Sequence, residues 1–145
     1  MADKVLRIGG ASGFWGDAAR ATPQLLNSPD LDYIVYDYLA EITMSIMARA
    51  RAKNPDHGYA LDFITAAMKP NLKEIARQGV KIVSNAGGVN PQACANALRT
   101  LIAEMGLDLK VACVLGDDMI AQRDQLAEQG YTEMFTGAAF PAVDK

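Results

Sequence analysis

Acidic side chains that follow short apolar runs are the residues in this chain best suited to acid–base chemistry. Asp37 and Glu41 come after one such run and are four positions apart, so they share a helix face if Asp37 lies within the first turn. Asp17 follows a glycine-rich stretch. Two carboxylates held close together raise each other's pKa and can serve as general acid and base, or bind a divalent cation. We therefore predict Asp37, Glu41 and Asp17 as the catalytic acids or bases.

Two further carboxylates, Asp117 and Asp118, follow a later apolar run and could join such a cluster. Two adjacent aspartates are only weak evidence for a metal-binding site, and we predict no metal site. For Asp17 and Asp118 the alternative is structural, because an acidic side chain stabilises the positive N-terminal end of a helix.

A glycine-rich stretch holds four of the twelve glycines, at positions 9, 10, 13 and 16. Glycine lets a ligand approach the backbone, and a strand that enters such a loop before a helix aims N–H groups at an anion. The alternative is a tight turn that needs glycine for its conformation. The two adjacent aromatic residues could cover a ligand or pack over the sheet edge. We predict that the substrate or anion is bound here by Gly10, Ser12, Gly13, Phe14, Trp15 and Gly16.

A second unusual loop spans residues 84–91, and it contains two glycines and two asparagines. We predict that Asn85, Gly87, Gly88 and Asn90 also contribute to substrate or anion binding. Asn90 has a structural alternative, because asparagine followed by proline is a strong start for a helix.

Short apolar runs alternate with segments of helical periodicity, which indicates an α/β fold with a parallel sheet. We predict a Rossmann-like three-layer α-β-α arrangement, with a mostly parallel sheet of about four strands, in a single domain over residues 1–145. Ligands bind beyond the carboxyl ends of the strands in such folds, and the glycine, asparagine and acidic clusters all fall there. The predicted strands are residues 5–8, 31–36, 80–83 and 109–115, and the predicted helices are residues 17–26, with Pro23 ending or kinking the helix, 39–53, 59–77, broken near Pro70, 91–105 and 119–129.

Charge and composition exclude several kinds of partner. The net charge is −3, and no basic block is present to bind nucleic acid or an anionic membrane. No apolar run approaches the length of a membrane span or a signal peptide, so we expect a cytoplasmic protein.

Cys94 and Cys113 lie in apolar stretches and are expected to be free thiols. With His57 as the single histidine, a multi-histidine metal site within this chain is excluded.

Four stretches, in the same order along the chain, resemble the N-terminal part of the acyclic terpene utilisation (AtuA-like) family. They are residues 9–17 (GGASGFWGD), 31–41 (LDYIVYDYLAE), 58–63 (GYALDF) and 84–91 (SNAGGVNP). The resemblance implies a part in the catabolism of terpenoid or branched acids as coenzyme A thioesters, with hydratase- or lyase-type chemistry on a small-molecule acyl or carboxylate substrate. It leaves the cofactor unknown, with coenzyme A as part of the substrate. Family members are longer, which implies either a fragment or a subunit whose remainder lies on a second chain.

Two alternatives remain open on the residues alone. The first is an NAD(P)-binding oxidoreductase, because Asp37 lies about 20 residues beyond the glycines, where an acid that binds the ribose belongs. No Tyr-x-x-x-Lys pair is present to support it. The second is a non-catalytic subunit that docks on a second subunit or forms a homo-oligomer, since a short parallel sheet leaves an edge that can pair with another chain.

Overall fold

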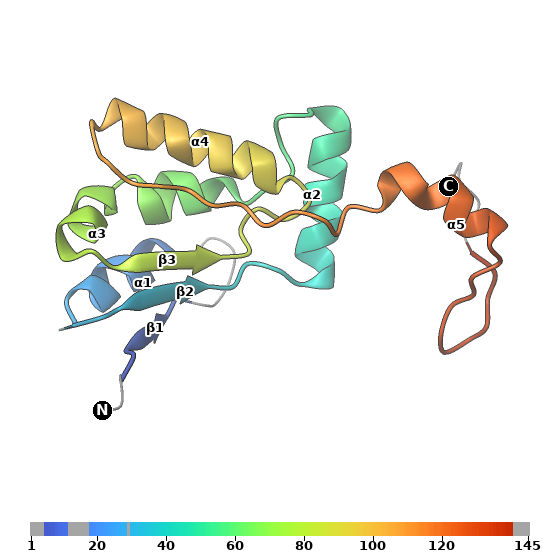
Figure 1. Cartoon of the computed structure of the whole chain (residues 1–145), viewed down its shortest axis with the longest axis horizontal. Coiled ribbons are helices and arrows are strands. Elements are labelled where there is room, and N and C mark those ends of the chain that lie inside the picture. The colour runs from blue at the N-terminus through green and yellow to red at the C-terminus, as the bar shows by residue number, and fades with distance from the viewer. Residues whose placement is uncertain (1–4, 12–17, 29, 141–145) are drawn as a thin grey trace. The chain divides into compact units, whose positions relative to one another are not determined.

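The computed structural model describes residues 5–11, 18–28 and 30–140 of the chain (Figure 1). They belong to two compact units, Met1–Cys113 and Val114–Lys145, and each unit is described by itself. The predictions for Ser12, Gly13, Phe14, Trp15, Gly16 and Asp17 lie outside the described residues.

The sheet of the first unit has three parallel strands in the order β1-β2-β3 (Figure 1). Their register aligns Gly9 with Ile34 and Ile34 with Ile82. The first strand begins later than predicted, so that Gly10 is its last residue rather than part of the loop. The strands are β1 (Ile8–Gly10), β2 (Tyr33–Tyr36) and β3 (Lys81–Ser84).

The predicted fourth strand, residues 109–115, does not form a ladder in the part of the chain that the structure describes. Alternate residues of this segment are half-buried, and Leu107, Leu109 and Val111 pack against the core. One backbone group of the segment is bonded to a side chain instead of a strand: the Arg99 guanidinium donates to the Val111 carbonyl at 3.0 Å. The apolar run is therefore only partly buried, and it lacks the strand pairing that was predicted for it, because that pairing depends on the neighbouring backbone.

The helices of the first unit follow the predicted order. The predicted break near Pro70 is confirmed, and Gly79 ends the helix that follows it in a left-handed conformation, with φ 71°. Asn90 and Pro91 begin the next long helix as predicted. The elements are α1 (Ala18–Leu26), α2 (Glu41–Lys53), the π-helix η1 (Phe63–Met68), α3 (Leu72–Gln78) and α4 (Pro91–Glu104).

Pro23 was predicted to end or kink the first helix. It does not end the helix, because α1 continues through Pro23 to Leu26. Proline removes one helical hydrogen bond. Burial of Thr22 and Leu26 on the inward side of α1 holds the helix together across that position, while Pro23 itself is exposed.

One face of the sheet is covered and the other is open among the described residues of this unit. Ile34 and Tyr36 are buried on the face that packs against the helices, and a Cβ placed on Gly9 would meet Leu25 of α1 at 2.9 Å. On the opposite face, Ile8 and Val83 are 60% and 51% exposed. The predicted covering of both faces, as in a three-layer arrangement, is therefore not observed here; the α/β class and the parallel sheet are confirmed.

The second unit contains a short helical segment followed by an irregular tail, as predicted. It consists of the 3-10 turn η2 (Ile120–Gln122), the helix α5 (Arg123–Glu128) and an isolated antiparallel bridge between Thr132 and Ala139. Large apolar side chains of this unit are exposed, among them Val114 at 93% and Phe135 at 86%. No helix among the described residues is both long enough and apolar enough to span a lipid bilayer.

Candidate functional site

The side chain of Asn85 links the carboxyl ends of β2 and β3. Its amide nitrogen donates to Oδ1 of Asp37 at 2.7 Å, and its carbonyl oxygen accepts from the backbone N–H of Tyr38 at 2.8 Å. Asp37 directly follows β2 and Asn85 directly follows β3, so the two parallel strands deliver them to the same edge. The structure thus brings together two of the predicted site residues, Asp37 and Asn85.

The Asp37 carboxylate is exposed and held in its charged form. The hydrogen bond from Asn85, with a second from the backbone N–H of Leu39 at 3.3 Å, lowers the pKa of Asp37 below its usual value. The group is therefore ionised at neutral pH and can accept a proton or a hydrogen bond, or repel a second anion.

Glu41 is the first residue of α2, whereas Asp37 precedes that helix. The expectation that the two carboxylates share a helix face depended on Asp37 being in the first turn, and this is wrong. Thr43, in the first turn of α2, holds the end of the loop that separates them. Its hydroxyl accepts from the Ala40 N–H at 2.7 Å and donates to the Ala40 carbonyl at 2.8 Å. Glu41 is exposed at the helix start, where its charge favours the positive end of the helix dipole.

Tyr38 is a residue of this edge that the sequence analysis did not select. It is 5% exposed, and its hydroxyl has no hydrogen-bond partner among the described residues. Its ring stacks on Tyr36 with 6.4 Å between centroids and meets Phe63 edge-on at 5.8 Å. Burial, followed by the nearby Asp62, raises the pKa of Tyr38 far above its ordinary value, so the hydroxyl stays protonated. The alternation of Ile34, Tyr36 and Tyr38 was the available signal, because it continues the buried face past the strand.

Gly87 and Gly88 allow the second loop to pack closely. A Cβ on Gly87 would lie 2.7 Å from Pro91, and one on Gly88, whose φ is +53°, would meet the sulfur of Met47 in α2. Both glycines therefore have a packing role. Their predicted role in anion binding stays a prediction.

Asn90 uses both ends of its side chain within the protein. Its oxygen accepts from the Ala93 N–H at 3.3 Å and so caps α4. Its nitrogen donates to the carbonyls of Pro55 at 2.7 Å and His57 at 2.8 Å, which fastens the loop before η1 to the start of α4. The helix-capping alternative is confirmed, and binding of a ligand by Asn90 stays a prediction.

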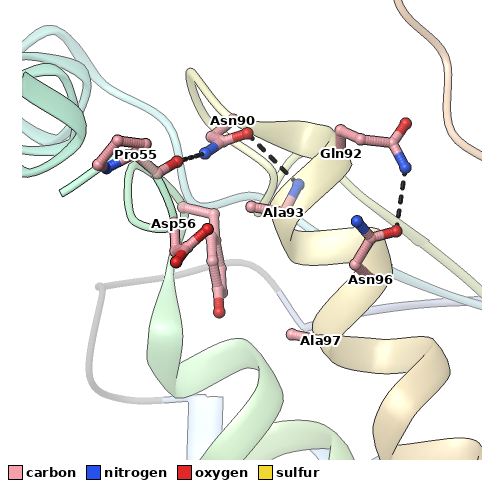
Figure 2. A pocket seen from close by; sticks show the side chains of 8 residues that line it. Pro55, Asp56, Asn90, Gln92, Ala93, Asn96 and Ala97 are labelled. Atoms are coloured by element: carbon pink, nitrogen blue, oxygen red, sulfur yellow. Dashed lines mark hydrogen bonds between the residues drawn. The ribbon is translucent and has the colours of Figure 1, made fainter.

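An open groove of about 380 Å³ lies beside this fastening, between the loop at 55–59 and the first turns of α4 (Figure 2). Gln92 and Asn96 are on the helix side, where Gln92 donates to Asn96 at 3.0 Å (Figure 2). The groove lies at the helix start rather than at Asp37. It is lined by Pro55, Asp56, Tyr59, Asn90, Gln92, Ala93, Asn96 and Ala97.

The other residues considered in the sequence lie away from the Asp37–Asn85 pair or outside its unit. In the second unit, the Asp118 carboxylate accepts from the Ile120 N–H at 3.1 Å, which agrees with the alternative that Asp118 stabilises the start of a helix. Cys94 and Cys113 are free thiols, as expected, and burial raises the pKa of Cys94 to about 12. His57 is exposed. No group of three or more His, Cys, Asp or Glu side chains is placed to hold a metal ion within the described ranges.

The first unit is thus an α/β domain that carries polar residues at the carboxyl ends of its parallel strands, as ligand-binding domains of this class do. The chain belongs to the acyclic terpene utilisation family AtuA, whose family model matches residues 6–145. The resemblance inferred from the four stretches is confirmed, and the family supports a part in acyclic terpene utilisation. Searches of curated proteins and of solved structures found no significant match.

Proposed function

We propose that this chain binds the acyl or carboxylate group of a terpenoid or branched acid at the carboxyl ends of β1, β2 and β3, as part of an enzyme with hydratase- or lyase-type chemistry. The observation that carries the proposal is the family match over residues 6–145. Degradation of a branched acid passes through additions, eliminations or carbon–carbon cleavages next to a carbonyl group. Each of these steps needs a base that removes a proton and donors that hold the carbonyl oxygen.

Asp37 is the base in this proposal. It is exposed, it is ionised at neutral pH, and Asn85 fixes its position relative to both strand ends. A base held by a neighbouring side chain loses little rotational freedom when the substrate binds, which favours productive geometry. Glu41 and Asp17 are the candidates for the partner acid, and the glycine-rich stretch with Ser12 is the candidate for binding the anionic end of the substrate.

Binding is tested first, with the purified chain and isothermal titration calorimetry. The probes are senecioyl-coenzyme A, which is a branched enoyl thioester, free coenzyme A, NAD and NADP. Saturable binding of senecioyl-coenzyme A that free coenzyme A does not reproduce supports the proposal. Binding of NAD or NADP alone would favour the oxidoreductase alternative instead, and an absence of binding to every probe would favour the non-catalytic subunit.

Variants then locate the binding. Glu41→Gln and Asp37→Asn remove a charge at the strand ends, and Asp108→Asn is the matched control, since Asp108 is an exposed carboxylate after the C-terminal end of α4. We expect the first two to change the dissociation constant of senecioyl-coenzyme A by about threefold or more, with Asp108→Asn unchanged, because charges near a bound ligand act over about 10 Å at ordinary salt. Equal behaviour of all three variants contradicts the placement of the site.

A further inference from the structure

The groove beside α4 lies between two segments that the protein fastens to each other. Asn90 donates to the carbonyls of Pro55 and His57, which joins the loop on one side of the groove to the helix on the other. Gly58 allows this close approach, because its φ is +104° and a Cβ on it would lie 3.2 Å from the Cβ of Asn90. A groove whose walls are fixed in advance loses little conformational freedom when a ligand binds.

The charge of the lining limits what the groove can bind. Among the described residues that line it, only Asp56 is charged, and its side chain is exposed. A phosphate or a free carboxylate is disfavoured beside Asp56, because like charges repel. The other lining side chains are amides, a phenol and small apolar groups. The occupant that matches them is uncharged and combines hydrogen-bonding groups with apolar carbons.

Two amides of α4 offer an acceptor and a donor to such an occupant. Gln92 donates to Oδ1 of Asn96 at 3.0 Å, and Figure 2 shows the nitrogen of Asn96 on the other side of its amide. The carbonyl oxygen of Gln92 and the amide nitrogen of Asn96 have no hydrogen-bond partner in the described part of the chain. Ala93 and Ala97 are one helical turn apart and also line the groove, where their short side chains leave room for apolar carbons.

The loop from β3 to α4 connects the groove to the strand ends. The Asn90 N–H donates to the Gly87 carbonyl at 2.9 Å, which closes a tight turn. Two residues of chain from Asn85 to Gly87, followed by this turn, bring the Cα atoms of Asn85 and Asn90 within about 14 Å of each other. Because Asn85 also holds Asp37, one extended ligand can reach from the groove to the proposed base.

We propose that the groove binds the pantetheine arm of a coenzyme A thioester whose acyl group lies at Asp37. This inference rests on the proposed function, and it specifies that the substrate is the thioester rather than the free acid. The arm is uncharged, carries amide, hydroxyl and methyl groups, and extends about 14 Å at the spacing of an extended backbone. Its amides exchange hydrogen bonds with Gln92 and Asn96. Its methyl groups lie against Ala93 and Ala97.

The first test compares two thioesters of the same acyl group by calorimetry with the wild-type chain. Senecioyl-coenzyme A carries the whole arm, whereas senecioyl-N-acetylcysteamine ends after the first amide. We expect the coenzyme A thioester to bind at least about tenfold more tightly, because only its arm reaches the groove. Equal affinities would overturn the inference, since the rest of the arm would then contribute nothing.

The second test fills the groove. Ala97→Leu adds three carbon atoms at a lining position, and Ala103→Leu makes the same change at an exposed position of α4 that does not line the groove. We expect Ala97→Leu to weaken binding of senecioyl-coenzyme A by about tenfold or more and to leave the short thioester within about twofold. Ala103→Leu should leave both affinities unchanged.

Asn96→Ala provides a second variant, because this side chain is exposed and its removal leaves the fold intact. The loss of one neutral hydrogen bond should weaken binding of senecioyl-coenzyme A by about threefold to tenfold. Thermal unfolding verifies that each variant is folded, and Asn96→Ala decides the outcome if Ala97→Leu is not. Wild-type affinity in the folded groove variants would overturn the inference.

These measurements separate failure of the inference from failure of the proposed function. If the short thioester binds, and Asp37→Asn changes its affinity while the groove variants change nothing, the proposed function stands and the groove inference is wrong. If free coenzyme A binds as tightly as senecioyl-coenzyme A, and Ala97→Leu weakens both, the groove holds the arm and the acyl site at Asp37 is wrong. If the wild-type chain binds none of these probes, both are wrong.

Discussion

Asn85 is the residue on which the geometry of the strand ends depends. Its two side-chain hydrogen bonds connect segments that are 47 and 48 positions apart in the chain. One bond orders the backbone at Tyr38 and the other stabilises the charge of Asp37. A single amide therefore determines both where the acidic group lies and how strongly it holds a proton.

Replacing Asn85 with alanine tests this at the residue scale. We expect the pKa of Asp37 to rise toward its ordinary value, because the largest cause of its lowering is the bond from Asn85. A lowered pKa in the folded state stabilises the protein above the unfolded pKa, and this contribution disappears as the pH falls through the folded pKa. The substitution should therefore cost stability at neutral pH and cost less in acid.

The measurement is an NMR titration of the Asp37 carboxyl carbon, accompanied by thermal unfolding at several pH values. Asn96→Ala is the control, since Asn96 is also an exposed amide, and its hydrogen bonds in the described part of the chain are to Gln92 and Arg99 of its own helix α4. If the pKa of Asp37 is the same in wild type and Asn85→Ala, the bond is absent in solution.

At the scale of elements, the loop from β3 to α4 is shaped by close packing. Gly88 has φ +53° and lies against Met47 of α2, so that any side chain would collide there. Gly79, at the end of α3, has φ +71° with no atom within 4 Å of the position of a Cβ. The two glycines share a left-handed backbone and differ in the space around them.

Alanine substitutions at these two positions separate conformational strain from crowding. Gly79→Ala should lower the free energy of unfolding by about 1 kcal/mol, which is the cost of a left-handed conformation for a residue with a Cβ. Gly88→Ala should cost about 2–4 kcal/mol, because displacement of Met47 adds to that strain. Urea unfolding of both variants measures the difference, and equal losses would mean that Met47 moves aside without cost.

Sequence patterns predicted some of these elements well and others poorly, for identifiable reasons. The start of α4 at Pro91 and the end of α3 at Gly79 were predictable because the local chemistry of capping decides them. The fourth strand was not, because residues 109–115 have the apolar side chains of a strand while ladder formation depends on a neighbour that the pattern does not specify. Asp37 was selected because acidic residues directly after strands are conspicuous, and its catalytic role stays a prediction. Tyr38 was not selected because a buried tyrosine looks like a core residue from the sequence, and only the structure shows that its hydroxyl has no hydrogen-bond partner among the described residues.

At the scale of the whole molecule, the hydrophobic core belongs to the first unit. The buried apolar residues of the described chain lie between Ala11 and Ile102. In the second unit, every described residue except Leu126 and Ala127 is exposed. Over residues 114–140, the second unit therefore contributes no buried core of its own.

Limited proteolysis of the full chain tests this division. Thermolysin cleaves before large apolar residues, and we expect rapid cuts beyond Cys113, at exposed positions such as Leu115, Met134 and Phe135. The remaining fragment, close to residues 1–113, should resist the protease far longer, and mass spectrometry identifies its end. Resistance of the tail equal to that of the core would contradict the division. If that resistance is lost on dilution, a second copy of the chain covers the tail.

The hydrogen bonds from Asn90 to the loop before η1 determine which positions of this contact can change during evolution. Asn90 holds the loop before η1 through the main-chain carbonyls at positions 55 and 57, and not through their side chains. The identities of those two residues are therefore nearly free to vary, while position 90 is not. Related chains should tolerate many residues in place of His57 and few in place of Asn90, although the two positions form the same contact.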